Sequence, residues 1–299
     1  MTPLSSVVLD QRAVLTVSGA DRRAFLQGLV SNDVERAGAA RAIHAALLTP
    51  QGKFLHDLFI VELGDTLLLD VEASRRTELL KRLSMYRLRS KVSLADGGDD
   101  WSVVAFFGAG AGVPFGLDEE AGHAAPTAGG VVFVDPRLPA LGLRAILPRG
   151  EAEKVAVARG FAQAPFATYD RLRLAHGVPD GSRDLPVDKA ILLESGFDEL
   201  NGVDWKKGCY MGQELTARTK YRGLVRKRLM PVEIEGPVPA PGTPLLFDGK
   251  DAGEMRSGVD GLGLALVRLE AAAASAAAGR PIEAGASRLV AKRPDWARF

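Results

Sequence analysis

DWKKGCYMGQELTARTKYRG, residues 204–223, holds the only cysteine of the 299-residue chain, Cys209. Two lysines precede this cysteine and glycines stand close on either side of it. Nearby positive charges favour the thiolate, which is the form of cysteine that reacts and binds metals, and glycines let the backbone approach a ligand closely. The stretch therefore indicates a functional thiol. The alternative is a small buried apolar side chain, the commonest fate of a free cysteine.

The stretch and the residues just after it are strongly basic. Between residues 206 and 228 eight side chains are basic and one, Glu214, is acidic. Trp205, Tyr210 and Tyr221 stand among these charges and offer flat faces on which a conjugated ring can lie. The mixture predicts a site for an anionic ligand with an aromatic head, and the alternative is an ordinary solvated surface.

The overall composition is that of a globular protein, with 46% hydrophobic residues and 38 lysines and arginines against 37 aspartates and glutamates. This balance argues against a general nucleic-acid binder, because that function needs a basic surplus. A single cysteine forms no internal disulfide, which indicates a reducing compartment. The first residues lack the pattern of a secretory signal, and no apolar run reaches the roughly 18 residues of a membrane span. We therefore expect a cytoplasmic monomer that binds neither nucleic acid nor membrane.

Hydrophobic periodicity predicts strands and helices in alternation up to about residue 165, and a different texture after residue 228. Pro- and Gly-containing turns divide residues 42–72 into three strands of an antiparallel sheet. Beyond residue 228, short alternating runs broken by Pro and Gly predict a small all-β domain. Further strands are predicted at 13–19, 101–108 and 129–137, and helices at 20–34, 74–88 and 151–161.

The four histidines do not complete a familiar site with the cysteine. A cysteine protease or acyltransferase pairs its thiol with a histidine, and a structural zinc ion needs four ligands. The histidines stand in no recognised spacing to Cys209, so we expect no resident metal site. At most, Cys209 acts as a transient ligand of an iron–sulfur cluster shared with a partner. The histidines are His44, His56, His123 and His176.

The opening stretch also decides the predicted fold, because it resembles the K-G-C-[FY]-x-G-Q-E signature of the YgfZ family. These folate-binding proteins support iron–sulfur proteins and are related to the T-protein (aminomethyltransferase) of the glycine cleavage system. The likeness extends to LTVSGADRRAFLQGLVSNDV, LLTPQGKFLHDLFIVE, YDRLRLAHGVPDGSRD and AGEMRSG, and so covers most of the chain.

The resemblance implies an α+β protein of three domains arranged in a ring around a tunnel that holds tetrahydrofolate, with antiparallel sheets, helices and a small C-terminal β-barrel. The domains it implies are a discontinuous folate-binding domain of residues 1–45 with 165–226, a ferredoxin-like domain of residues 46–164, and a barrel of residues 227–299.

Site residues follow from the same resemblance and from the chemistry of the ligand. A pterin ring presents an edge that pairs with a carboxylate, and the glutamate tail of folate suits Arg or Lys. Glu194, in a segment similar to the E-[AS]-G-[LF] of T-proteins, is the carboxylate we select, while Arg171 and Arg173 are candidates for wall or tail contacts or else for structural salt bridges. The predicted chemical residues are Cys209, Lys207, Gln213 and Glu214, and the predicted folate contacts are Glu194, Asp57, Trp205, Tyr210, Arg173 and Arg218.

One departure from the T-protein pattern bears on the reaction. T-proteins carry two adjacent aspartates in the central hairpin, where this chain has His56 and Asp57. An imidazole in place of a carboxylate changes the local charge and the protons available, so we expect no glycine-cleavage activity. The sequence thus predicts a tetrahydrofolate-binding accessory protein for the assembly or repair of iron–sulfur enzymes, which acts with client or assembly proteins. The alternative is a folate-dependent one-carbon transferase, an aminomethyltransferase or a demethylase.

Overall fold

The computed structural model describes residues 3–223 and 225–299, and these form two compact units, each built from several stretches of the chain. Within the described residues, no helix is long and apolar enough to cross a membrane. Unit 1 comprises Met1–Leu48, His56–Tyr169 and Asn201–Met211, and unit 2 comprises Thr49–Leu55, Asp170–Leu200 and Gly212–Phe299.

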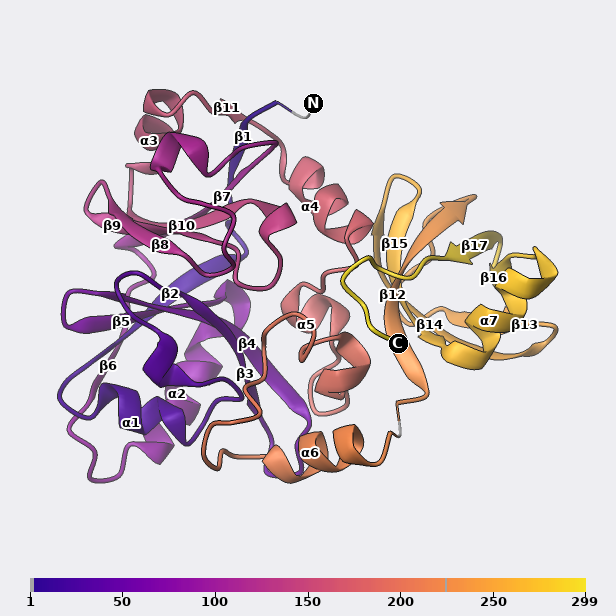
Figure 1. Cartoon of the computed structure of the whole chain (residues 1–299), viewed down its shortest axis with the longest axis horizontal. Coiled ribbons are helices and arrows are strands. Elements are labelled where there is room, and N and C mark those ends of the chain that lie inside the picture. The colour runs from indigo at the N-terminus through magenta and orange to yellow at the C-terminus, as the bar shows by residue number, and fades with distance from the viewer. Residues whose placement is uncertain (1–2, 224) are drawn as a thin grey trace. The chain divides into compact units, whose positions relative to one another are not determined.

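A five-stranded antiparallel sheet forms one layer of unit 1, in the order β3-β4-β5-β2-β6 (Figure 1). Its central strands are buried on both faces, as expected of a sheet that is covered on both sides. Two helices, α1 (Arg22–Gln27) and α2 (Arg76–Tyr86), contribute to the core that covers one face. The strands are β2 (Arg12–Ser18), β3 (Ile43–Leu48), β4 (Phe54–Leu63), β5 (Thr66–Glu72) and β6 (Ser93–Asp96).

A six-stranded sheet forms the second layer of unit 1, in the order β11-β1-β7-β10-β9-β8. Helix α3 (Ala152–Ala158) packs on this sheet, and Phe106 lies at the centre of their core with Phe115 and Phe161. The strands are β1 (Ser5–Val8), β7 (Trp101–Phe107), β8 (Ala124–Thr127), β9 (Gly130–Val134), β10 (Leu143–Pro148) and β11 (Ala162–Gln163).

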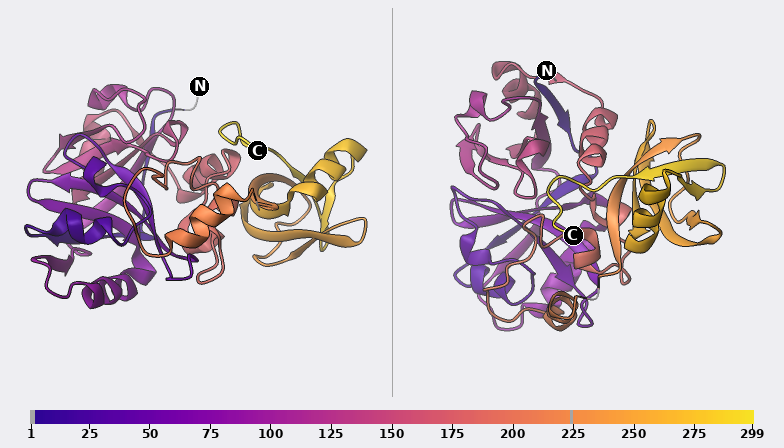
Figure 2. Two further views of the ribbon diagram at one scale, coloured as in Figure 1. Left: turned by 60° about the horizontal axis from the view of Figure 1, so that its bottom comes forward. Right: turned by 45° about the vertical axis from the view of Figure 1, so that its right-hand side comes forward.

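Unit 2 contains a closed barrel (Figure 2). Its strand order is β12-β15-β14-β13-β16-β17. Closure leaves no strand edge unpaired, and apolar side chains such as Val232, Leu245 and Met255 fill the interior. The strands are β12 (Lys227–Glu235), β13 (Pro244–Phe247), β14 (Lys250–Val259), β15 (Leu262–Arg268), β16 (Ile282–Ala284) and β17 (Ser287–Ala291).

Four helices are assigned wholly or mainly to unit 2. Helix α7 packs its Ala271 into the barrel core. Helix α4 begins in unit 1 and continues into unit 2, and a 3₁₀ turn at Leu192–Ser195 follows α5. The helices are α4 (Phe166–Ala175), α5 (Gly181–Asp184), α6 (Gln213–Tyr221) and α7 (Leu269–Ala278).

The structure confirms the predicted α+β class with a C-terminal barrel and sheets whose strand pairs are antiparallel, apart from the short parallel pair of β1 and β11. The first helix is shorter than predicted, because α1 ends at Gln27 and the chain then turns through residues 28–33. The turn leaves backbone carbonyls without helical partners, and the Lys207 ammonium, much later in the chain, donates hydrogen bonds to them. The division into three domains stays a prediction.

Candidate functional site

Lys207 anchors the cysteine-containing loop to unit 1. Its ammonium group donates three hydrogen bonds to backbone carbonyls at the end of helix α1 and just after it: Gln27 at 2.8 Å, Val30 at 2.6 Å and Asn32 at 2.7 Å. These carbonyls have lost their helical partners because the helix ends at Gln27, so the ammonium replaces the bonds that a longer helix would make. Burial lowers the pKa of Lys207 to about 8, although Asp33 and Asp204 oppose this shift. The side chain therefore holds the loop in place.

Four further hydrogen bonds fix the loop, two before Cys209 and two after it. The Asp204 carboxylate accepts hydrogen bonds from the backbone N–H groups of Lys206 and Lys207, at 2.7 and 2.9 Å. Downstream, the Met211 N–H donates to the carbonyl of Gly28, and its sulfur accepts a hydrogen bond from the Tyr86 hydroxyl at 3.2 Å. The backbone is thus tied down both before and after Cys209.

Cys209 itself is exposed, with Gly208 beside it in open space. The alternative of a buried apolar cysteine is therefore wrong. Of the two aromatic residues predicted as ligand contacts here, Tyr210 is 7% exposed and its ring lies 5.1 Å from the Lys207 ammonium, while Trp205 is half-buried. The loop buries Lys207 and Tyr210 and presents the thiol to solvent.

The second half of the signature starts helix α6 in unit 2. Gly212 has φ of +79°, a left-handed conformation that glycine adopts without strain, and Gln213 follows as the first helical residue. Glu214 and Arg218 form an exposed ion pair of 2.6 Å one helical turn apart. These two charges face solvent, and in the described structure their main partner is each other.

Asp57 lies in a buried network of ion pairs within unit 1. Its carboxylate accepts from the Arg12 guanidinium at 3.2 Å and lies 3.8 Å from the His44 imidazole. Arg12 also binds Asp70, which Arg144 binds at 2.6 Å, so the network joins β2, β4 and β5 to β10. Burial alone would raise the pKa of Asp57, but Arg12 and His44 hold it well below its usual range.

His56 points away from that network and is 3% exposed. Its Nε2 atom lies 3.6 Å from a carboxylate oxygen of Glu78. Burial and the nearby Arg75 lower the pKa of His56 to about 4, so the imidazole is neutral at pH 7. The pair that replaces the two aspartates of T-proteins is thus one locked carboxylate and one neutral imidazole.

Glu194 lies in unit 2, in the 3₁₀ turn Leu192–Ser195. Gly196 ends the turn with φ of +72°, and a Cβ there would come within 2.6 Å of the Trp296 ring, so both conformation and space require glycine. Within the described residues the Glu194 carboxylate makes no hydrogen bond or ion pair. Burial raises its pKa, partly offset by the charges of Lys227, Lys53 and their neighbours.

Arg173 has a structural environment in unit 2. Its guanidinium donates to the carboxylates of Asp170 and Asp184 and to the Ser257 hydroxyl, at 2.6, 2.5 and 2.8 Å, and the side chain is 3% exposed. This network joins helices α4 and α5 to barrel strand β14. Arg171 donates to the carbonyl of Asp260. The salt-bridge alternative considered for Arg173 is therefore what the structure contains.

The predicted site residues divide between the two units. Unit 1 holds Asp57, Trp205, Lys207, Cys209 and Tyr210, and unit 2 holds Arg173, Glu194, Gln213, Glu214 and Arg218. No group of three or more His, Cys, Asp or Glu side chains among residues 3–223 and 225–299 is placed to hold a metal ion.

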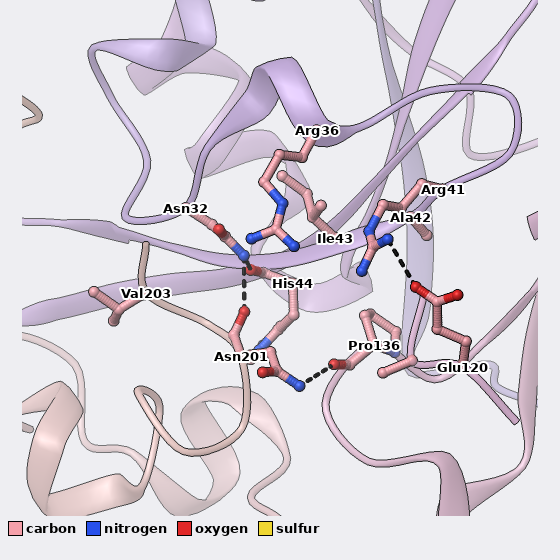
Figure 3. A pocket seen from close by; sticks show the side chains of 11 residues that line it. Asn32, Arg36, Arg41, Ala42, Ile43, His44, Glu120, Pro136, Asn201 and Val203 are labelled. Atoms are coloured by element: carbon pink, nitrogen blue, oxygen red, sulfur yellow. Dashed lines mark hydrogen bonds and ion pairs between the residues drawn. The ribbon is translucent and has the colours of Figure 1, made fainter. Parts of the chain in front are cut away.

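Sequence reasoning missed a polar pocket of about 190 Å³ in unit 1 (Figure 3). It also missed Asp204, although an aspartate two residues before an N–H group that it accepts is a recognisable turn signal. The pocket had no comparable signal, because its wall comes from four separate stretches of the chain. The polar residues that line it are Asn32, Arg36, Arg41, His44, Glu120 and Asn201.

Comparisons with known proteins place these features in a family. The chain is 36% identical over 308 residues to the mitochondrial iron–sulfur cluster assembly factor IBA57 of Homo sapiens, covering 96% of this chain and 84% of that protein. The chain belongs to the IBA57 family. The IBA57 of Mus musculus is 34% identical over 322 residues, with the same two coverages.

Two further findings concern the fold of this IBA57-family chain. The C-terminal β-barrel domain of CAF17 matches residues 226–299, which are the barrel. The glycine cleavage system aminomethyltransferase T of Bartonella henselae superposes with a TM-score of 0.76 over 99% of this chain and 87% of that one, at 14% identity. The aminomethyltransferase fold predicted from the sequence is confirmed.

The IBA57 relatives correct the predicted location. The human and mouse IBA57 proteins are mitochondrial, so the expectation of a cytoplasmic protein is wrong. The physical reason is that a chain with a single cysteine indicates a reducing compartment but does not indicate which reducing compartment.

Proposed function

We propose that this chain is an accessory factor for the assembly or repair of iron–sulfur proteins, and that its Cys209 thiol takes part directly. The observation that carries the proposal is the loop in which Lys207, Asp204 and Met211 fix the backbone around a thiol that stays exposed. A rigid, exposed thiol suits transfer to or from another protein. The family is named for iron–sulfur cluster assembly, and the YgfZ-like signature agrees with this role.

Cys209 acts in this proposal as one ligand among several. A conventional iron–sulfur cluster takes about four ligands, and this chain has one cysteine. The cluster is therefore cargo held jointly with a client or assembly protein, which supplies the remaining ligands. Such sharing makes the contact transient, because the cluster leaves when the partner's own ligands complete its coordination.

Tetrahydrofolate or a derivative is the small ligand we propose, bound through Glu194. The fit rests on a half-buried carboxylate with a raised pKa and no partner among the described residues, which is typical of a ligand site. A pterin edge offers paired N–H donors to such a carboxylate. The cations whose charges reach Glu194, including Lys53, Lys227 and Arg256, suit the carboxylates of the folate tail.

One-carbon transfer on the glycine-cleavage pattern is disfavoured by the His56–Asp57 pair. A general acid or base needs a group that can exchange its proton near the working pH. Asp57 is buried and paired with Arg12, and His56 is buried, with a pKa of about 4. We therefore propose that any bound folate serves the iron–sulfur role without aminomethyl transfer.

The thiol is tested by Cys209→Ser in cells that lack their own copy of the factor. We expect iron–sulfur enzyme activities to fall to the level of the deletion, while the melting temperature of the purified variant stays that of the parent, because the side chain is exposed. Met85→Ser, which removes an exposed sulfur from the same unit, is the matched control and should complement fully. Full complementation by Cys209→Ser would overturn the proposal.

The folate site is tested by calorimetry with tetrahydrofolate on the purified chain. We expect binding, a rise in melting temperature by mass action, and loss of both in Glu194→Gln. Glu283→Gln, an exposed glutamate of the barrel in the same unit, should bind like the parent. Equal binding by the parent and Glu194→Gln would remove Glu194 from the site, and no heat in the parent would remove folate from the proposal.

A further inference from the structure

The polar pocket of unit 1 has a rigid wall that the proposed function does not use. Asn32, which is 5% exposed, donates through its amide to the carbonyls of His44 and Asn201, both at 2.7 Å. Asn201 in turn donates to the carbonyl of Pro136 at 3.1 Å. Two asparagine side chains thus hold β3, the turn at residue 201 and the turn at residue 136 around one cavity, so the cavity is formed before any ligand arrives.

Two arginines from one short stretch of chain supply the positive charge of this cavity. Arg36 and Arg41 reach in from the same side, with Asn201 and Pro136 opposite them (Figure 3). Their side chains are 50% and 40% exposed, so the guanidinium groups are accessible to a solute. Burial lowers the pKa of His44, which leaves that wall neutral and the arginines as the charged donors.

Each of these arginines has one ionic partner among the described residues, and the pair of Arg41 is the more exposed of the two. Arg41 pairs with Glu120 at 2.9 Å, and the Glu120 side chain is 61% exposed. Arg36 lies 3.3 Å from one oxygen of Asp204, whose side chain is 13% exposed and whose other oxygen accepts two backbone N–H groups. Exposed ion pairs contribute little free energy, whereas a carboxylate or phosphate that receives guanidinium groups in a bidentate manner is held much more strongly.

We propose that this pocket binds a small carboxylate or phosphate anion between Arg36 and Arg41, and that Glu120 occupies Arg41 until the anion displaces it. A cavity of about 190 Å³ suits an anion of a few heavy atoms. The site goes beyond the proposed function, because it uses neither Cys209 nor Glu194. Its occupant neutralises the two arginines that the chain itself pairs incompletely.

The experiment is isothermal titration of the purified full chain with inorganic phosphate and with succinate, each at an ionic strength matched by chloride. We expect at least one probe to bind with one site per chain, and the two probes distinguish a phosphate from a carboxylate ligand. Arg41→Gln should weaken binding about tenfold, since it removes a charge-assisted contact. Arg41 is the cleaner choice, because Arg36→Gln also removes the contact with Asp204.

Glu120→Gln gives a test of opposite sign. Removal of the competing carboxylate should tighten binding roughly twofold to fivefold, in line with the free energy of an exposed ion pair. Glu119→Gln, which changes the neighbouring exposed glutamate, should leave the affinity unchanged. The proposal is overturned if neither probe binds above chloride, if Arg41→Gln binds as the parent does, or if Glu120→Gln fails to bind more tightly. Because all these side chains are exposed, circular dichroism should show every variant folded.

Discussion

Asp57 in unit 1 and Glu194 in unit 2 are two carboxylates that the sequence assigned to one ligand, yet their environments are opposite. Asp57 is 4% exposed and bound by Arg12, and its pKa lies well below the usual range. Glu194 is half-buried without a partner among the described residues, and burial raises its pKa. A carboxylate already paired inside the protein stabilises the fold, whereas one left unpaired at partial burial is available to a ligand.

The cysteine loop repeats this contrast within a few residues. Lys207 is buried with three carbonyl partners, and Cys209 is exposed. Both residues were predicted to take part in the chemistry, but Lys207 holds the backbone in place and Cys209 is exposed to solvent. In both units, a side chain that is bound inside the protein stabilises the fold, whereas one that is not is available to a ligand or to another protein.

The largest expected effect is a loss of stability that directly tests the comparison of the two carboxylates. Asp57→Asn should lower the free energy of unfolding by about 3 to 5 kcal/mol, because it removes one charge from a buried ion network. Glu194→Gln should change it by less than about 0.5 kcal/mol, since that carboxylate has no internal partner. Urea unfolding of the two variants measures both values. Equal losses of unfolding free energy would show that the two carboxylates stabilise the fold equally, and the comparison would fail.

Next in size is the anchor of the cysteine loop. Lys207→Met keeps much of the side-chain volume but leaves three buried carbonyls without a donor, and should cost about 3 kcal/mol. Lys206→Met, at the exposed neighbour, should stay within about 0.5 kcal/mol of the parent. The comparison fails if the two lysine variants unfold at the same urea concentration.

His56 is a buried group whose effect on stability should depend on pH. Its pKa is about 4 in the folded chain and about 6.5 in the unfolded chain, so between these values the unfolded chain binds a proton that the folded one does not. The free energy of unfolding should therefore fall by between about 2 and 3 kcal/mol from His56 as the pH drops from 6.5 to 4. His56→Gln should remove this part of the pH dependence in urea unfolding measured across that range. An unchanged dependence in the variant would place the titrating group elsewhere.

The smallest effect concerns the charges at the start of α6. Arg218→Gln removes an exposed pair one helical turn long and should cost less than about 0.5 kcal/mol, with no loss of iron–sulfur enzyme activity in complementation. A strong loss of activity with normal stability would move Arg218 from a surface pair to a partner or ligand contact, and so restore its predicted role.

The sequence was informative where a pattern is local. Alternating apolar runs after residue 228 were sufficient to predict the small all-β domain whose first strand begins at Lys227, because strand periodicity and turn residues act over a few positions, while its closure into a barrel was implied by the family resemblance. The first helix was predicted too long for a related reason. Residues 28–34 keep helical spacing, but the Lys207 ammonium, far away in sequence, accommodates the carbonyls of a chain that has already left the helix.

What the sequence determined by itself is the family signature, the α+β class and the identity of the one thiol. Tertiary structure alone decided which charged groups are bound by partners inside the protein. Arg173 is bound by two aspartates and Lys207 by three carbonyls. Arg36 and Arg41 line one pocket with Glu120, which is 79 positions after Arg41, and with residues still farther along the chain. The physical reason is that a charge acts according to its burial and its partners, and both come from segments that only folding brings together.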